Sequence, residues 1–401
     1  FAATCEGWAT YQMKRQFGLI GTRGEEISTT RTTTRTCEVN GTVWNVPAGT
    51  TNNTPMCITT QGLLVERATT NYALRSGTMT TGAAATAPWV LGFATATTTT
   101  GAAPDGSNVS TVTTTANNGS LYQIVTLPAG TGPYTASAMV AAASGTAVES
   151  VVMDCGAGVA SACSCLRSDG GACSVTASTT FCIGYATVGT SFVKLSTTGT
   201  CSTSLTARNI VLHDGQFLSS FGAVGKFAMA QLEAGSAPTS YIPTGGAGAG
   251  PCAAGAWCRN ADVATVPTPA GLSPSRWCVE VTGTPYGGRA WSGANRWLFG
   301  WGSGATNVAA LYEYTAGVKI DVWDGASALK SVSYATPPSL GGHRLSMAAN
   351  SGALSLRLDG ASIGSTSGAG SGVLGSINAT TQIGSFGGTA QFDGYLRDFK
   401  V

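Results

Sequence analysis

Charged side chains are scarce in this chain of 401 residues: Asp, Glu, Lys and Arg make up 10% of it, against about 25% in an ordinary globular protein. The 21 basic and 19 acidic residues leave a formal net charge of +2. A nucleic-acid-binding protein carries a basic face, and a protein bound to an anionic membrane surface carries a polybasic segment. The composition argues against both classes and predicts no nucleic-acid partner.

Long apolar runs and helical periodicity are also missing. A membrane-spanning helix needs about 18 consecutive apolar residues, whereas the best runs here are the short stretches Ala138–Ala143 and Ala223–Ala230. We therefore expect no membrane insertion. Met13–Ile20 is long enough for a turn or two of helix, and internal glycines weaken any helix over Phe217–Glu233.

Histidine is rare, with His213 and His343 the two in the chain. A serine hydrolase of the α/β type places its nucleophile in a Gly-x-Ser-x-Gly elbow, and neither histidine lies near one. No phosphate-binding loop or dinucleotide fingerprint stands between a strand and a helix. The sequence predicts turn positions for both histidines and no enzyme of these classes.

Thr and Gly, in contrast, are abundant, with 57 and 55 residues. Short β-branched or aromatic runs alternate with Gly, Asn and Asp turns at intervals of about eight to twelve residues, a spacing typical of antiparallel sandwiches around a dry core. The first predicted series of strands is Ser120–Leu127, Tyr134–Val140, Val148–Met153, Phe181–Val188 and Phe192–Ser196. The second is Trp277–Val281, Trp297–Trp301, Ala309–Tyr314, Val318–Trp323, Arg344–Ala348, Ser355–Leu358 and Gln382–Ser385.

Twelve cysteines are many for a cytosolic protein of this length and favour disulfides in an oxidising compartment. They fall into groups of three, six and three, so the odd outer groups require a bridge between segments or a free thiol. The disulfide candidates are Cys5, Cys37, Cys57, Cys155, Cys163, Cys165, Cys173, Cys182, Cys201, Cys252, Cys258 and Cys278. Zinc ligation is the less favoured alternative, because no paired Cys-x-x-Cys and no neighbouring His accompany the central group.

Five segments carry a family resemblance. Gln61–Ser76 (QGLLVERATTNYALRS) resembles the segment that opens lectin-like sandwich domains in phage tail and fibre proteins, and Ala230–Thr244 (AQLEAGSAPTSYIPT) resembles the segment that closes the same domain. Thr36–Asn45 (TCEVNGTVWN) fits the family's lead-in strand. Further on, Ser355–Gly360 (SLRLDG) and Phe392–Val401 (FDGYLRDFKV) resemble parts of a laminin-G or concanavalin A-like sandwich. Domains of this kind also occur in bacterial surface proteins.

The resemblance implies an all-β fold with two antiparallel β-sandwich (jelly-roll, concanavalin A/laminin-G-like) domains and an extended N-terminal arm. Together with the composition, it predicts the arm and its lead-in strands over residues 1–62 and a first lectin-like sandwich over 63–244. A Gly-rich linker is expected over 245–256, where GGAGAG gives flexibility, and a second, laminin-G-like sandwich over 257–401.

Glycanases share the concanavalin A-like fold, and their retaining mechanism needs two carboxylates about 5 Å apart. The nearest stretch, KIDVWD, offers Asp321 and Asp324 but places Lys319 where the nucleophile would stand. A strand followed by a turn at Asp324-Gly325 explains these residues better, and we expect no catalytic residues.

A glycan-binding site would need aromatic faces and hydrogen-bonding side chains close together. Trp291 with Tyr286 and Arg289 gives the best candidate, because the glycine-rich loop around Trp291 favours an exposed ring. Trp297 and Phe299 are expected to alternate into one face and fill the core. No metal or cofactor is expected: Asp359, Asp393 and Asp398 give no calcium-loop pattern, so a structural calcium has no support here.

The sequence therefore predicts a non-enzymatic structural or adhesive subunit of an extracellular assembly, either a cell-surface filament or an appendage resembling a phage tail fibre. We expect a homo-oligomer or polymer assembled through the N-terminal arm, with surface glycans as partners. A start at Phe1 and the cysteines favour an exported protein over a virion component. The alternatives are a monomeric secreted carbohydrate-binding module and, less favoured, a glycan hydrolase.

Overall fold

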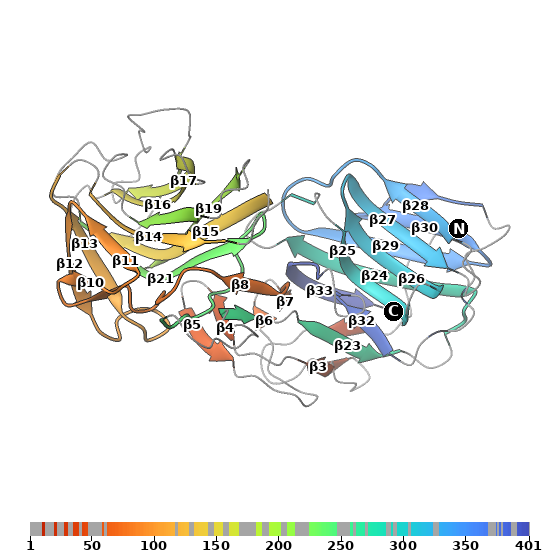
Figure 1. The fold of residues 1–401 in the computed structure, drawn as a ribbon. Helices are drawn as coiled ribbons and strands as arrows, with labels where there is room; N and C mark the ends of the chain where they lie inside the picture. Colours follow the sequence, from red (N-terminus) through yellow and green to blue (C-terminus); the bar gives the residue numbers. More distant parts are fainter. Residues whose placement is uncertain are drawn as a thin grey trace. The chain divides into compact units, whose positions relative to one another are not determined.

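In the computed structural model, the described secondary-structure elements are all β-strands, as the sequence predicts (Figure 1). It describes residues 10–12, 20–21, 28–30, 35–39, 42–46, 58–59, 62–116, 119–127, 132–142, 148–154, 160–167, 182–186, 192–201, 207–212, 224–246, 257–259, 262–268, 272–285, 290–291, 295–303, 306–323, 329–367, 374, 377, 380–385 and 391–400. Two compact units divide the chain. Unit 1 is Phe1–Thr34, Val46–Ala68 and Asn260–Val401, and unit 2 is Arg35–Asn45 and Thr69–Arg259.

Unit 1 contains two large sheets. The nine-stranded sheet runs β2 (Ile20–Gly21), β1 (Thr10–Gln12), β33 (Gly394–Lys400), β24 (Arg276–Pro285), β29 (His343–Asn350), β30 (Ala353–Leu358) and β31 (Ala361–Ser365), with β7 (Gly62–Val65) paired to β33 and β6 (Ile58–Thr59) to β7. The seven-stranded sheet runs β28 (Leu329–Tyr334), β27 (Gly317–Trp323), β26 (Thr306–Tyr314), β25 (Arg296–Ser303), β32 (Thr380–Ile383), β23 (Val263–Pro267) and β3 (Ser28–Thr30). Side chains from both sheets form one core.

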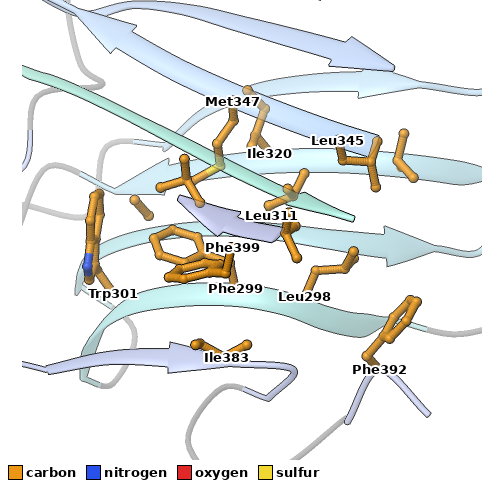
Figure 2. Close-up of a cluster of buried hydrophobic side chains, with 14 of the residues drawn as sticks. Leu298, Phe299, Trp301, Leu311, Ile320, Leu345, Met347, Ile383, Phe392 and Phe399 are labelled. Carbon is orange, nitrogen blue, oxygen red and sulfur yellow. The ribbon is translucent and has the colours of Figure 1, made fainter. Parts of the chain in front are cut away.

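The core of unit 1 is rich in large aromatic and aliphatic side chains (Figure 2). Phe299 is fully buried, and its ring centroid lies 4.8 Å from that of Trp301 and 5.9 Å from that of Phe399. Trp301 in turn meets Trp277 edge-on at 5.3 Å. Burying a side chain such as Phe contributes about 1.5–3 kcal/mol, so this cluster joins the two sheets. Phe399 is buried in this core, so the last strand, β33, packs on it.

A β-bulge corrects the expectation for Trp297 and Phe299. The register of β25 against β26 shifts between these two residues, from Trp297 opposite Tyr312 to Phe299 opposite Leu311. Leu298 and Phe299 both lie in the core, whereas Trp297 packs with Tyr312 in a separate cluster. An extra residue in one strand reverses the alternation beyond it, so the prediction that Trp297 and Phe299 share one face is wrong.

Two glycines, Gly360 and Gly394, explain parts of the motifs in the C-terminal region. Asp359 and Gly360 have φ values of 50° and 87° and connect β30 to β31, the tight hairpin that the Asp-Gly pair predicts. Gly394 opens β33, where a Cβ atom would collide with the carbonyl oxygen of Thr284. The glycine of FDGYLRD is therefore needed, because β33 and β24 approach closely at this position.

Unit 2 also contains two main sheets. The six-stranded sheet runs β11 (Trp89–Gly92), β14 (Ser120–Thr126), β20 (Ala207–Leu212), β16 (Val148–Asp154), β17 (Ala160–Arg167) and β18 (Cys182–Ala186). The five-stranded sheet runs β12 (Ala94–Thr99), β13 (Val109–Thr114), β21 (Val224–Ala234), β15 (Gly132–Ala142) and β19 (Val193–Cys201). Three two-stranded pairs complete the unit: β9 (Thr80–Thr81) with β10 (Ala84–Ala85), β8 (Thr69–Asn71) with β22 (Trp257–Arg259), and β4 (Arg35–Val39) with β5 (Thr42–Val46). The pairings are antiparallel except β17 with β18, which is parallel.

The core of unit 2 lies between its two main sheets and follows the period-2 alternation of the strands. Leu121, Ile210 and Leu212 come from the six-stranded sheet, and Phe227 and Leu232 from the five-stranded sheet. All twelve predicted strand segments overlap observed strands. Phe217–Glu233, the weakened helix candidate, instead contributes β21, in which the residues from Phe227 to Glu233 are all buried.

The second half of the opening motif is tied to the closing motif by buried side-chain hydrogen bonds. The Asn71 amide donates to the carbonyl oxygens of Ala230 (3.2 Å) and Ile242 (2.9 Å), and its oxygen accepts the backbone N–H groups of Ala73 (3.1 Å) and Leu232 (3.0 Å). All four groups of one buried amide are satisfied, as a buried polar side chain requires. Two segments about 160 residues apart in the sequence are thereby fastened together.

Three further groups extend this anchor. The Ser76 and Tyr241 hydroxyls lie 2.7 Å apart, and the Thr244 hydroxyl donates to the carbonyl oxygen of Ala73 at 2.6 Å. The fully buried Glu233 carboxylate accepts the Thr69 hydroxyl at 2.9 Å. Burial raises the pKa of Tyr241, even though its hydrogen bond with Ser76 opposes this shift. The TTNYALRS and LEAGSAPTSYIPT residues thus have a structural role.

The first half of the opening motif belongs to unit 1. Leu63, Leu64 and Val65 are buried in β7, which pairs with β33, and the Glu66 N–H donates to Asp262 at 3.1 Å. The expected boundary between residues 62 and 63 therefore differs from the observed division, which falls between Ala68 and Thr69. The motif is shared between units because its apolar LLV stretch completes one core and its polar residues anchor the other.

Candidate functional site

The structure places Trp291, the expected glycan platform, in the core of unit 1. Its side chain is 0% exposed, its ring centroid lies 5.4 Å from that of Phe392, and its Nε1 donates to the carbonyl oxygen of Gly341 at 2.9 Å. A ring without exposed surface has no face on which a sugar can stack, so the prediction of an exposed platform is wrong. Tyr286 and Arg289 lie outside the described residues.

The Trp291 ring packs instead against His343, with centroids 5.8 Å apart. His343 begins β29, and its ring bridges two loops. Its Nδ1 lies 2.7 Å from Asp359 Oδ2, and its Nε2 lies 3.1 Å from the Ser339 hydroxyl and 3.0 Å from the Ser339 carbonyl oxygen. A serine, a histidine and an aspartate therefore meet here, which the sequence did not predict.

This arrangement resembles a catalytic triad only in its residue types. In a triad, the histidine Nε2 takes the proton of the serine hydroxyl while Nδ1–H donates to the aspartate. Here the carbonyl oxygen of Ser339, which can only accept, occupies the same nitrogen. His343 consequently joins the Ser339–Gly342 loop to the β30–β31 hairpin, and the second predicted turn histidine, His213, lies outside the described residues.

The charge of Asp359 is stabilised by the same contacts. Burial alone would raise the pKa of this carboxyl, but the hydrogen bonds from His343 and from the Arg344 N–H (2.9 Å), with the charges of both residues, lower it overall. Asp359 stands at the tight turn between β30 and β31, and its hydrogen bonds hold this turn to His343 and Arg344. These contacts give Asp359 a structural role.

Asp321, one of the two carboxylates considered for glycanase chemistry, is buried and bound by three donors. It is 3% exposed, and its carboxylate accepts the Tyr312 hydroxyl, the Ser331 hydroxyl at 2.6 Å and the Lys319 ammonium at 3.0 Å. Burial raises the pKa of Tyr312, and its hydrogen bond to the Asp321 carboxylate raises it further. A carboxylate that already accepts from three donors has little freedom to act on a substrate. Asp324 lies outside the described residues.

Asp321 belongs to the side of the seven-stranded sheet that faces away from the core. The residues on that side alternate with the core residues of β26 and β27: Tyr312 and Ala310 with Leu311, and Asp321 with Ile320. Trp297 stacks on Tyr312 there, with centroids 4.4 Å apart and an interplanar angle of 42°. This outer aromatic pair could not be predicted from the sequence, because no residue pattern indicates the bulge in β25.

The described acidic and cysteine side chains form no metal cluster and include two disulfide-bonded cysteines. No cluster of three or more His, Cys, Asp or Glu side chains suited to a metal is found among the described residues. Asp393 pairs with Arg67 at 3.0 Å and Asp398 with Arg397 at 3.5 Å, so the aspartates considered for calcium have separate partners. Cys258 and Cys278 are each disulfide-bonded. Across the described part of the chain, no helix has the length and apolarity of a membrane span.

Comparison with protein-family models finds no match, and comparison with curated proteins finds none. Among solved structures, the receptor-binding domain of botulinum neurotoxin mosaic serotype C/D is similar at 12% identity and a TM-score of 0.28, over 35% of this chain and 36% of that one. The chain thus matches about a third of the length of these toxin domains. Domains LG4-5 of the mouse laminin α1 chain match at 13% identity and a TM-score of 0.25, over 71% of this chain and 86% of theirs. The CBM22-1–CBM22-2 tandem of Paenibacillus barcinonensis Xyn10C matches at 12% identity and a TM-score of 0.25, over 82% and 97%. At these scores the all-β fold rests on the chain's own strands.

Proposed function

We propose that this protein is a non-enzymatic structural and adhesive subunit of an extracellular assembly, a cell-surface filament or tail-fibre-like appendage, that polymerises through its N-terminal segment and contacts surface glycans. The observation that carries the proposal is the pairing of β1 with β33, in which Thr10 lies opposite Lys400 and Tyr11 opposite Phe399. An N-terminal strand that adds to a sheet in this way within one chain can add to the same sheet of a neighbouring copy. Strand addition of this kind is an established mode of assembly.

The engaged carboxylates support the non-enzymatic part of the proposal. Asp321 on β27 and Asp359 at the end of β30 are each held by donors of their own unit, whereas a glycanase uses two carboxylates that face one substrate. The disulfide-bonded Cys258 and Cys278 support an oxidising, extracellular location. The wider framework of bridges among the twelve cysteines remains part of the proposal.

Electron microscopy of the native protein, with and without a reducing agent, tests the proposal. Regular fibres are expected, and a variant lacking residues 1–30, which removes β1, β2 and β3, is expected to remain as soluble particles. Fibres that persist unchanged in this variant would rule out assembly through the N-terminal segment. Dispersed particles of single chains in the wild type would instead support the alternative, a monomeric carbohydrate-binding module.

A further inference from the structure

Three of the four large apolar side chains that are exposed among the described residues lie in one part of unit 2. They are Val90 (42% exposed), Phe93 (67%) and Ile124 (60%), whereas the fourth, Leu340, belongs to unit 1. Val90 is in β11 and Ile124 in the neighbouring strand β14, while Phe93 follows the end of β11. Single exposed apolar residues are ordinary, but a gathered set marks an interaction surface.

The strand register places this set on the outward side of the six-stranded sheet. Val125 of β14 lies in the core, so Tyr122 and Ile124, which alternate with it, face outward. Val90 lies opposite Tyr122 on one side, and Val211 of β20 lies opposite it on the other (Figure 1). An apolar strip therefore runs over β11, β14 and β20.

Gly92 and Phe93 shape one end of this strip. A Cβ atom at Gly92 would lie 3.5 Å from the Tyr122 ring, so this ring lies close to the backbone of β11. Phe93 has a φ of 43°, a left-handed conformation that bulky side chains disfavour. The Thr115 N–H donates to the Phe93 carbonyl oxygen at 2.8 Å and holds this turn. Glycine would suit the backbone better, and a mostly exposed ring adds little to the core, so the described part of unit 2 does not explain a phenylalanine here.

The strip lies in a stretch of the sequence that almost lacks charge. Residues 76–148 contain one charged side chain, Asp105, where the chain's average of 10% predicts about seven. The Asp105 carboxylate accepts the N–H group and the hydroxyl of Ser107, at 3.0 and 2.6 Å, and so serves a local turn. Edge strands commonly carry charges that prevent association, yet the edge strands β11 and β12 contain none. This part of unit 2 therefore has no electrostatic barrier to association.

The absence of charge favours a second copy of the same chain as the partner. A two-fold contact brings the same surface of both copies together, so a charged group near the axis would meet its own kind. An uncharged apolar strip avoids this repulsion, and it also avoids burying ions without partners. Recognition of a different, charged protein would use complementary charges, which β11 and β14 do not contain.

We propose that the outward side of β11 and β14 is a contact between two copies of this chain, related by a two-fold axis, with Val90, Phe93 and Ile124 at its centre. The contact belongs to unit 2 and is separate from strand addition through the N-terminal segment. The inference therefore goes beyond the assembly route proposed above and does not depend on it.

The test places the photoreactive residue p-benzoylphenylalanine at position 93 of the full chain and mixes this protein with isotopically labelled wild type. Irradiation should join position 93 to the β11 or β14 peptide of the labelled copy, which mass spectrometry identifies by its mass. Ile124→Lys in both proteins should lower the yield of this product at least about fivefold, because like charges then meet across the axis. Leu340→Lys is the matched control, since Leu340 is 70% exposed but lies in unit 1, and it should leave the yield within about twofold.

A charge swap distinguishes a second copy from any other occupant of the strip. Mixing Ile124→Lys with Ile124→Glu should restore the cross-link, because opposite charges then face each other. A different partner protein or a small ligand would not give this restoration. Val90→Lys is a second disrupting variant, which keeps the test valid if Ile124→Lys fails to fold.

Three outcomes would overturn the inference. They are cross-links confined to the chain that carries the probe, cross-links that reach only other regions of the labelled copy or another molecule, and a yield that both folded lysine variants leave unchanged. Electron microscopy of the variant lacking residues 1–30 tests the N-terminal segment, so the two proposals can fail separately.

Discussion

Asn71→Ala should destabilise unit 2 selectively. The Asn71 side chain makes four hydrogen bonds, is 1% exposed, and fastens β8 to β21 and to the 239–244 segment. Truncation leaves two carbonyl oxygens and two N–H groups without this partner. Each unsatisfied buried group costs about 1–3 kcal/mol, and partial relaxation limits the sum, so we expect a loss of about 3–5 kcal/mol.

Urea unfolding with hydrogen-exchange mass spectrometry measures this loss unit by unit. With an m-value of about 2 kcal/mol/M, the midpoint for peptides from β21 should fall by about 1.5–2.5 M, while peptides from β24 and β29 in unit 1 should unfold as in the wild type. Asn71→Asp is the sharper companion, because it keeps the shape but points a carboxylate oxygen at the carbonyls of Ala230 and Ile242. A loss below about 1 kcal/mol in Asn71→Ala would refute the claim that this residue anchors the two segments.

The remaining predictions concern unit 1. Phe299→Ala should cost about 3–5 kcal/mol in urea unfolding, because the fully buried ring leaves a cavity; a cost under 1 kcal/mol would contradict its place in the core. Tyr312→Phe should cost about 1–3 kcal/mol, since it removes one of three donors from a buried carboxylate, and Tyr314→Phe is its control. Asp359→Asn should lower the melting temperature by about 1–3 °C at pH 7, a small effect because the carboxylate is half exposed. The pKa of Asp359 is lower in the folded than in the unfolded chain, so its stabilisation is present above the unfolded pKa of about 3.9 and is lost as the pH falls through the folded pKa; a difference that does not shrink as the pH falls would contradict this. Finally, neither the wild type nor Ser339→Ala should hydrolyse p-nitrophenyl acetate above background, and turnover that the substitution abolishes would revive the triad.

The strands were predictable because their cause is local. Alternating β-branched and aromatic residues between Gly, Asn and Asp turns define a strand by themselves, and the predicted segments from Ser120–Leu127 to Gln382–Ser385 all overlap strands. The Asp359-Gly360 hairpin was equally local, since two residues with positive φ need only their own side chains to be suitable.

The candidate site was less predictable, because two tryptophans exchanged their expected places. Trp291 follows a glycine-rich loop, which favoured exposure, yet it is fully buried against Phe392 and His343. Trp297 was assigned to the core by simple alternation, yet the bulge before Phe299 moves it to the opposite side. A bulge depends on how two paired strands fit together, and the sequence of one strand does not contain that information.

The sequence by itself determined the class of the fold, the absence of a strong surface charge and the positions of most strands, because each depends on composition or on neighbours along the chain. Tertiary structure alone decided which partners distant residues meet. Asn71 meets Leu232, and Ser339 and Asp359 both contact the ring of His343. It also divided the opening motif between two units. Asn71 and Leu232 are about 160 residues apart in the sequence, yet a hydrogen bond between them needs a short distance and the right direction in space. Only the packed sheets, which fix where each backbone segment runs, bring such groups within reach.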